Sequence, residues 1–566
     1  MTAYNPPRRK PKTTGDPLEI DLVYNVRPCG SCSFFWPEDA TQQPYGPFPA
    51  YDFDSNTPQT VQPTGNPRSY VWVKGATRSQ AFPNPEIMDG CRKAPIMTIG
   101  INPNLTAFAP GTTGASWCYP NFTSENATDA WTKYAYYYRY RSVYQERFQL
   151  DFVKRYLLNE GKVTASKTGI VVGAQRSSDA PSFDIEVKYD GDAKTTKIPV
   201  QWKLNEPRYV LLFDHYPPGN RFAAGDVLAA RLDVPAGEAV EVYQQQIGYY
   251  EQFVPTLDRF QELLRGRGHA DANLRIGEDV CQLDMVACAS PHWKPSFLGG
   301  EKSELAVIDN CVRKNAWAMK QFVQTRPAVL YLVGEASWNM FNDAFGALIK
   351  RDPPVSRHPV DGAFTLLHET TDPERPCRFE FETTIDGLKY SVSTRLVATP
   401  HFSYKTNFMP QFRMSGEAWH DVQKAYPACA KFLKTDPRLK VVEPPSKGEY
   451  LAIRIDSDAA GVFSTLENTY TDALPTLLRT YYNPHKDMAK VLEDLYDNGT
   501  LSYTAPADGK SGFLTRTEGS CQFCVNRHWS FPLGCPYEKT EIEPPPAAYL
   551  EKVADAIVAA GQSGDG

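Results

Sequence analysis

The sequence predicts an α/β fold built on a parallel sheet, because short apolar runs alternate with segments of helical periodicity. The runs at 96–101, 283–287 and 329–334 have the length and apolar character of buried parallel strands. Apolar residues at helical spacing follow at 305–325 and 336–349. Strands that alternate with helices in this way form a parallel sheet with helices on its faces.

A fourth strand is predicted at 388–398, where polar and apolar residues alternate before the segment turns apolar. This strand leads into Thr399-Pro400-His401, whereas the run at 96–101 leads into Asn102-Pro103. Ligands of open α/β sheets bind beyond the carboxyl ends of the strands. Asn102 and His401 are therefore expected at one functional edge of the sheet.

Two further regions have their own organisation. Within 123–280 the sequence predicts a helix at 135–158, hairpin strands within 181–232 and a long helix at 237–265. From 437 onward it predicts a strand, a helix near 465–496, a cysteine-rich loop at 521–535 and a final helix.

The composition is that of a soluble globular protein, with 42% hydrophobic and 22% charged residues over 566 positions. Residues 1–20 are expected to form a flexible basic arm, and the absence of an apolar signal core or of any long apolar run predicts a cytoplasmic protein without a membrane partner. The formal charge of -6 argues against a protein that coats nucleic acid over its whole surface. A local basic groove is still compatible with that charge.

Ile99-Gly100-Ile101-Asn102-Pro103-Asn104 resembles the first motif of the uracil-DNA glycosylase superfamily, in its mismatch-specific form. Thr399-Pro400-His401-Phe402-Ser403 resembles the second motif, which usually reads His-Pro-Ser. The resemblance implies a three-layer α/β sandwich with a central parallel sheet. It places the catalytic domain at 21–122 and 281–436, with an insertion at 123–280 and an extension at 437–566.

The order of four cysteines is similar to the iron–sulfur branches of that superfamily. Cys29 and Cys32 precede the first motif with Cys-x2-Cys spacing, and Cys288 and Cys311 follow in the same order as in those enzymes. The resemblance implies a structural [4Fe-4S] cluster, since glycoside hydrolysis transfers no electrons. Taken alone, a Cys-x2-Cys pair is equally typical of zinc.

The resemblance implies a DNA glycosylase that flips a base out of DNA and hydrolyses its N-glycosidic bond. Asn102 would position the attacking water, and His401 would stabilise the departing base through a hydrogen bond to its carbonyl. The expected substrate is uracil or another deaminated or modified base. The expected settings are DNA repair and defence against phage DNA.

Further roles follow from position relative to the two motifs. Gly100 and Ile101 are expected to line the base pocket, with Tyr119 or Phe122 as its stacking aromatic. Asp284 stands where the family usually carries an Asn that reads the base. An ionised Asp only accepts hydrogen bonds, whereas Asn also donates them, so a modified cytosine or a purine remains a candidate substrate beside uracil.

The second motif departs from the family pattern at Phe402, where Pro is usual. Beyond it, the side chains expected to contact the DNA backbone are Ser403, Lys405 and Arg413. Tyr404, Phe408 and Met409 are the candidates for a residue that wedges the duplex.

A second metal site is a candidate at Cys521, Cys524, His528 and Cys535, whose spacing suits zinc or a second cluster, although buried thiols would give the same pattern. The alternative function for the whole chain is non-catalytic: a glycosylase-derived iron–sulfur module that binds DNA or a protein partner. A redox protein with two clusters is a third reading.

Overall fold

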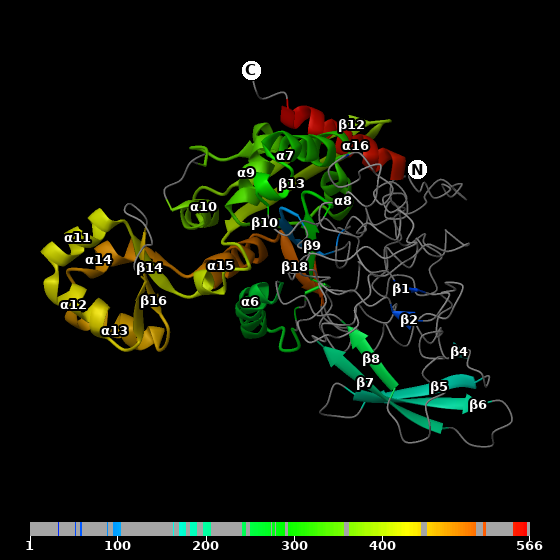
Figure 1. Cartoon of the computed structure of the whole chain (residues 1–566), viewed down its shortest axis with the longest axis horizontal. Coiled ribbons are helices and arrows are strands. Elements are labelled where there is room, and N and C mark those ends of the chain that lie inside the picture. Colours follow the sequence, from blue (N-terminus) through cyan, green and yellow to red (C-terminus); the bar gives the residue numbers. More distant parts are fainter. Residues whose placement is uncertain are drawn as a thin grey trace.

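A computed structural model of the chain describes its central and C-terminal parts most fully (Figure 1). The described residues are Cys32, 51–52, 57–58, Met88, 94–102, 162–163, 169–176, 182–189, 196–204, 240–244, 250–288 apart from 273, 275 and 278, 293–355, 361–442, 450–504, 513–516 and 547–562. In the strands at 51–58 and 162–244 only the backbone is described.

The main sheet has six strands in the order β11-β12-β13-β10-β3-β9. Four neighbouring strands are parallel, which confirms the predicted α/β class: β13 (Leu388–Thr399), β10 (Val329–Val333), β3 (Ile96–Gly100) and β9 (Val280–Asp284). All five residues of β3 and of β10 are buried, as expected of strands covered on both faces.

The sheet is mixed rather than parallel throughout, because β12 (Arg378–Ile385) and β11 (Ile349–Lys350) add an antiparallel edge. A two-residue turn, Asp386-Gly387, joins β12 to β13, and both residues have positive φ, 52° and 78°. Asp-Gly between two alternating segments is a strong hairpin signal. The sequence therefore carried the signal for this hairpin, which the expectation of a single strand at 388–398 left out.

Helices cover both faces of the main sheet (Figure 1). α6 (Val254–Gly266) and α15 (Pro484–Asp497) pack on each other and on one face, where the buried hydroxyl of Tyr331 donates to the Met488 carbonyl at 2.9 Å. α8 (Trp317–Thr325), α9 (Glu335–Phe345) and the final helix α16 (Ala547–Gln562) gather at Phe379 on the other. α10 (Gly362–Thr371) lies along β13.

Two predicted helices are interrupted. The segment 305–325 forms α7 (Glu301–Ile308), a π-helical turn η8 (Asp309–Lys314) and α8, because Ala316 adopts a left-handed φ of 50° that no continuous helix accommodates. The segment 336–349 is helical only through α9, and the 3-10 turn η9 (Gly346–Leu348) then leads into β11. A short 3-10 turn, η7 (Pro295–Phe297), precedes α7.

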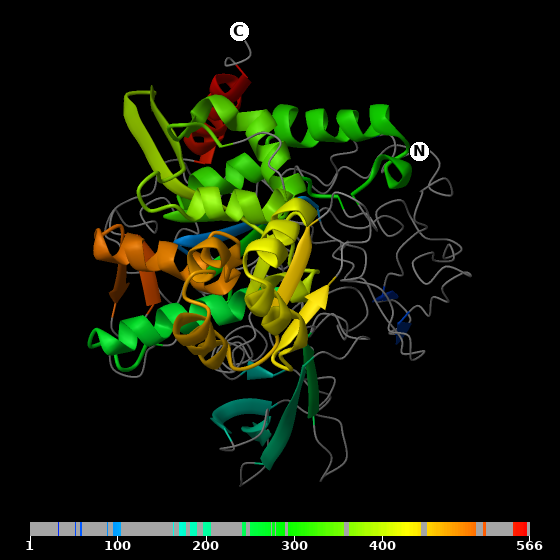
Figure 2. The ribbon, with the colours of Figure 1, turned by 90° about the vertical axis from the view of Figure 1, so that its left-hand side faces the viewer.

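The insertion contains a separate five-stranded sheet (Figure 2). Its strands are β4 (Lys162–Val163), β5 (Gly169–Arg176), β6 (Ser182–Tyr189), β7 (Thr196–Leu204) and β8 (Val240–Gln244). The predicted hairpin strands are thus confirmed at β6 and β7. The predicted helix at 237–265 is wrong in its first half, since β8 is a strand of alternating β-branched and polar residues, and η6 (Tyr250–Phe253) with α6 begins only beyond it. The predicted helix at 135–158 lies outside the described residues. The chain also forms a two-stranded sheet of β1 (Tyr51–Asp52) and β2 (Thr57–Pro58).

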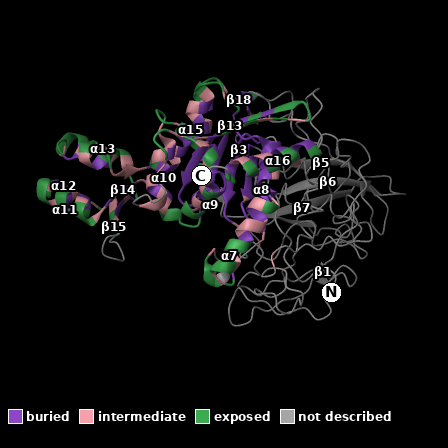
Figure 3. Ribbon diagram, turned by 90° about the horizontal axis from the view of Figure 1, so that it is seen from above, coloured by how far each residue is buried: buried purple, intermediate pink, exposed green. Residues whose placement is uncertain are grey.

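A smaller α/β unit spans 411–482 and protrudes from the main sheet (Figures 1 and 3). Its antiparallel sheet has the order β15 (Leu439–Val442), β16 (Leu451–Ile455), β14 (Gln411–Met414), β17 (Tyr481–Tyr482). Its helices are α11 (Gly416–Ala425), α12 (Pro427–Thr435), α13 (Ala459–Thr469) and α14 (Leu474–Leu478). It has its own buried core, centred on Phe412, Ile453 and Leu466.

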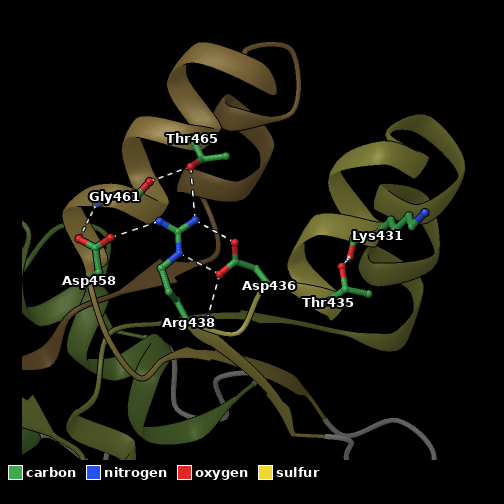
Figure 4. Close-up of polar contacts among 7 residues, drawn as sticks. All are labelled: Lys431, Thr435, Asp436, Arg438, Asp458, Gly461 and Thr465. Atoms are coloured by element: carbon green, nitrogen blue, oxygen red, sulfur yellow. Dashed lines mark hydrogen bonds and ion pairs between the residues drawn. The ribbon is translucent and has the colours of Figure 1, made fainter.

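Ion pairs inside this unit hold the start of α13 against the connection between α12 and β15 (Figure 4). The Arg438 guanidinium donates to Asp436 at 2.8 Å and to Asp458 at 3.2 Å, and the Asp458 carboxylate accepts from the Gly461 amide at the start of α13. An Asp at the N-cap of a helix accepts a hydrogen bond from a backbone N–H that would otherwise have no partner within the helix. Arg438, which directly precedes β15, thereby links the C-terminal end of α12 to the N-terminal cap of α13.

The C-terminal elements divide between the two cores. β14, which precedes the expected boundary at 436, pairs with β16 beyond it. The helix expected near 465–496 is three helices, because α14 and α15 each start anew with a proline, Pro475 or Pro484, in the first two positions. α15, the hairpin of β18 (Leu501–Thr504) and β19 (Phe513–Arg516), and α16 pack on the main sheet. Arg516 donates to the carbonyls of Arg326 and Ser393, and the predicted final helix is confirmed as α16. Among the described helices none has both the length and the apolar character needed to cross a bilayer.

Candidate functional site

The two motif loops leave the main sheet at the same edge. In the strand order β13-β10-β3-β9, Thr399 pairs with Val333, and Gly100 pairs with Asp284. Since all four strands are parallel, their carboxyl ends align there, and Asn102 and His401 follow two of them. The edge predicted from the sequence as the functional one thus carries both predicted catalytic residues.

Backbone hydrogen bonds continue past the strands and hold this edge together. Gly334 N–H donates to the Thr399 carbonyl at 2.9 Å, and Met285 N–H donates to the Gly100 carbonyl at 3.0 Å. Val286 N–H donates to the Ile101 carbonyl at 2.9 Å, and the Ile101 side chain is buried. The loops therefore begin from a fixed backbone.

The Asn102 amide is oriented by the loop after β9. Its Nδ2 donates to the Cys288 carbonyl at 3.2 Å, and the side chain is half-buried. With Nδ2 directed at that carbonyl, Oδ1 points away from it. An amide oxygen accepts hydrogen bonds, so this orientation suits an Asn that aligns a water molecule.

The His401 imidazole lies against Gly334, which follows β10. A Cβ built on Gly334 would lie 3.0 Å from His401 Cδ2, and Gly334 has a φ of 87° that disfavours any side chain. Ser403 N–H donates to His401 Nδ1 at 3.3 Å, so Nε2 carries the proton of the neutral ring. Burial lowers the pKa of His401 and favours that neutral form.

Asp284, the last residue of β9, lies against Gly100 of β3. A Cβ built on Gly100 would overlap Asp284 Oδ1, so the carboxylate occupies the space above a residue without a side chain. Asp284 and His401 share this arrangement: each comes from an outer strand of the parallel set and leans over a glycine of its inner neighbour. The sequence identified Asp284 and His401 but not Gly334 as the residue that makes room for the His401 ring. The only local signal for Gly334 was its position at a strand end, before an acidic residue.

Three of the four predicted cluster cysteines are described, and hydrogen bonds connect their surroundings. Ala287 N–H donates to Cys311 Sγ at 3.4 Å, and Cys288 is the next residue. Asn310, beside Cys311 in the π-helical turn η8, donates from Nδ2 to Cys32 Sγ at 3.9 Å. No group of three His, Cys, Asp or Glu side chains close enough to hold a single metal ion occurs among the residues that the structure describes. N–H donors aimed at cysteine sulfur are the kind of contact that stabilises cluster thiolates, and these two contacts are compatible with that role.

In the segment after His401, some of the side chains expected to contact DNA are exposed to solvent and others are buried. Ser403 and Lys405 are exposed, and Tyr404 is 62% exposed with its ring 5.9 Å from that of His401. Phe408, at the end of the 3-10 turn η10 (Lys405–Phe408), is buried and stacks on His485. Met409 is half-buried. Among the three wedge candidates, Tyr404 is the one that faces solvent.

Arg413 lies on β14 in a bidentate ion pair with Asp361, at 2.7 and 2.6 Å, and its guanidinium covers the Phe364 ring at 4.0 Å. Its side chain is 16% exposed. The structure thus gives this arginine an internal partner that the sequence, with Asp361 52 residues away, did not indicate.

Several predicted site residues lie outside the described residues: Cys29, Tyr119, Phe122, Cys521, Cys524, His528 and Cys535. The basic arm at 1–20 also lies outside them.

Comparison with known proteins adds no assignment: no family model, no curated protein and no solved structure matches this chain.

Proposed function

We propose that this chain is a DNA glycosylase that hydrolyses the N-glycosidic bond of uracil or another deaminated or modified base. The observation that carries the proposal is the convergence of Asn102 and His401 at one edge of four parallel strands. The resemblance of their loops to the two motifs of the uracil-DNA glycosylase superfamily supports the same fold and chemistry.

In the proposed reaction a water oxygen bonds to the anomeric carbon of a flipped nucleotide while the bond from that carbon to the base nitrogen breaks. The electron pair of the broken bond leaves with the base, which is neutralised by a proton that originates in the water. Asn102 Oδ1 aligns the water, and its amide is too weak a base to take the proton itself. Modest turnover follows, because the barrier is lowered mainly on the side of the leaving group.

His401 stabilises that leaving group. Its Nε2–H, set by the Ser403 contact to Nδ1, donates to the base carbonyl on which negative charge develops. Burial lowers the pKa of His401 and so favours the neutral ring near pH 7, in which Nδ1 accepts from Ser403 N–H and Nε2 carries the proton. One donor of this kind contributes roughly a 100- to 1000-fold rate increase.

Cys32, Cys288 and Cys311, with Cys29, would hold a [4Fe-4S] cluster, which would supply structure and no redox step. Asn102 donates to the carbonyl of Cys288, so the loop that bears this thiol also orients the proposed water-positioning amide. Because Cys311 is one of the proposed cluster ligands, Cys311→Ser is expected to reduce the iron content and the visible absorption of the protein.

The test uses anaerobically purified protein and duplexes that contain uracil, hypoxanthine or modified cytosines, scored for abasic sites. Product from at least one base is expected, and Asn102→Ala and His401→Ala should each reduce its rate by about 100-fold or more. Both variants should keep the cluster absorption of the parent. Binding to duplex DNA without abasic product from any base would contradict the proposal and favour the non-catalytic module.

A further inference from the structure

We infer that the sheet of the protruding unit binds the sugar-phosphate backbone of DNA through Lys440 and Arg454. Both residues lie on the open face of this sheet, the side that the helices of the unit do not cover. The inference rests on the proposed function for the identity of its ligand, but the surface lies outside both motif loops.

Helices cover only one face of this sheet. Along the chain the unit runs strand, helices, strand, strand, helices, strand, from β14 to β17, and the strands interleave in the order β15-β16-β14-β17. This is the connectivity of ferredoxin-like α/β sandwiches. All four helices contribute to a single core with Phe412 and Ile453, and they lie on the side away from the main sheet (Figures 1 and 3). The opposite face is therefore free of the helices of the unit.

Two cations lie side by side on the open face. Side chains alternate between the faces of a strand, so the residues between core positions of β15 and β16 are on this face: Lys440, Val442, Ala452 and Arg454. Lys440 pairs directly with Arg454 across the two strands. Like charges at directly opposed positions destabilise a sheet. An anion bound beside both cations would remove that repulsion.

The protein itself neutralises these cations only in part. Lys440 is exposed and forms no ion pair with any residue that the structure describes. Arg454 Nε lies 3.8 Å from Asp456 Oδ1 and has no hydrogen-bond partner within the described part of the chain. Asp456 is 40% exposed, so water weakens its attraction for Arg454. A guanidinium and an ammonium group are the side chains that phosphate oxygens prefer.

The composition of the open face favours phosphates over bases as the ligand. Four-stranded sheets that read single-stranded nucleic acid stack its bases on aromatic side chains. On the two central strands, β14 and β16, the open-face positions hold no aromatic residue: Gln411, Arg413, Ala452 and Arg454. Cations contact phosphates whatever the base sequence. Binding without sequence preference is therefore expected.

A series of contacts connects this face to the edge that bears the motif loops. The His401 ring lies against the residue that follows β10, and Glu335, one position later, reaches Gly362 at the start of α10. The residue before that glycine, Asp361, pairs with Arg413 on the open face. DNA adds only about 3.4 Å of length per base pair. A duplex engaged at the motif loops can therefore extend across α10 to the two cations.

The experiment measures the affinity for two unmodified duplexes of unrelated sequence, by fluorescence anisotropy over a series of NaCl concentrations. Lys440→Gln should weaken the binding of both duplexes by about 3- to 10-fold and reduce the slope of log affinity against log salt by about 1. The double variant with Arg454→Gln should reduce the slope by about 2. The matched control is Lys431→Gln, which removes an exposed lysine of α12 on the helical side of the unit and should change neither quantity.

Binding is measured without base release, so failure of this inference and failure of the proposed function are distinguishable. Weaker binding by Lys440→Gln, with no abasic product from any base, would support the DNA surface and contradict the glycosylase. If abasic sites form, Lys440→Gln should keep the parent rate at saturating DNA, because it lies away from the reacting atoms.

Three results would overturn the inference, whether or not abasic sites form. The first is the same affinity and salt slope in Lys440→Gln as in the parent. The second is an equal loss of affinity in Lys431→Gln, which would assign the effect to net charge alone. The third is a parent that binds neither duplex. Because Lys440 is exposed, its replacement is expected to leave the melting temperature of the protein unchanged.

Discussion

The edge of the main sheet and the protruding unit at 411–482 use polar side chains in opposite ways. At the edge, Asn102, Asp284 and His401 are positioned by backbone and glycine contacts. In the protruding unit and at its junction, the strongest polar contacts are ion pairs, Arg438 with Asp436 and Asp458, and Arg413 with Asp361. The contrast shows that a cation near a motif can have an acidic partner inside the protein, as Arg413 does.

The largest expected effect is on the junction between the protruding unit and the main sheet, where Arg413 pairs with Asp361. Arg413→Leu should destabilise the protein by about 3 kcal/mol, because it leaves the nearly buried Asp361 carboxylate without its partner. Urea unfolding measures the loss, and hydrogen exchange should quicken in β14 and α10.

Two matched variants sharpen this prediction. Asp361→Asn combined with Arg413→Leu should recover part of the stability, since Asn tolerates the left-handed φ of 63° at that position. Arg375→Leu removes an ion pair of a half-exposed arginine and should cost less than about 1 kcal/mol. Equal losses in the free energy of unfolding in Arg413→Leu and Arg375→Leu would show that the junction pair stabilises the protein no more than a half-exposed ion pair does.

A second prediction tests the glycine contact beneath His401. Gly334→Ala should reduce abasic-site formation by about 100-fold, because a methyl group 3.0 Å from Cδ2 displaces the ring from its position. Gly268→Ala is the control that measures the effect of a positive φ alone. At Gly268 φ is 98° and no atom lies within 4 Å of the added carbon. Comparable losses of activity in both variants would mean that backbone strain, and not displacement of His401, is responsible.

A third prediction concerns pH and the buried imidazole of His485. Burial lowers the pKa of His485 to about 4, where it stacks on Phe408 and contacts Thr256 Oγ1 at 3.1 Å. The unfolded chain, with a His pKa near 6.5, then binds the proton more tightly, so stability is full above pH 6.5 and falls toward pH 4.

The slope of that fall should approach one proton, about 1.4 kcal/mol per pH unit, and should diminish in His485→Gln. Urea unfolding at pH 7, 6, 5 and 4.5 gives the slope. His269→Gln changes the histidine that contacts the Tyr496 hydroxyl and serves as the comparison. The same slope in His485→Gln as in the parent would assign the acid sensitivity to other groups.

Local sequence patterns were enough to predict the four parallel strands and the loops that end them. Apolar runs of strand length, each followed by a polar or Gly-Pro-rich turn, are local signals, and β3, β10 and β13 lie at their predicted positions, whereas β9 begins three residues before the predicted run at 283–287 and ends at Asp284. The order of Asn102 and His401 along the chain therefore sufficed to place both at one edge. The antiparallel hairpin and the breaks after α7 and α9 were missed, because Asp386-Gly387 and Ala316 act through backbone conformation rather than hydrophobic period.

Which side chains meet could not be predicted, because it depends on how distant segments pack. Gly334 lies under His401 because β10 and β13 are neighbours although 67 positions separate the two residues, and Gly100 adjoins Asp284 across a gap of 184 positions. Arg413, expected at DNA, pairs with Asp361, which is 52 positions away. The hydrophobic pattern is a local property of neighbouring residues in the sequence. The pairing of charges and the packing of a side chain on a glycine depend instead on which distant strands become adjacent.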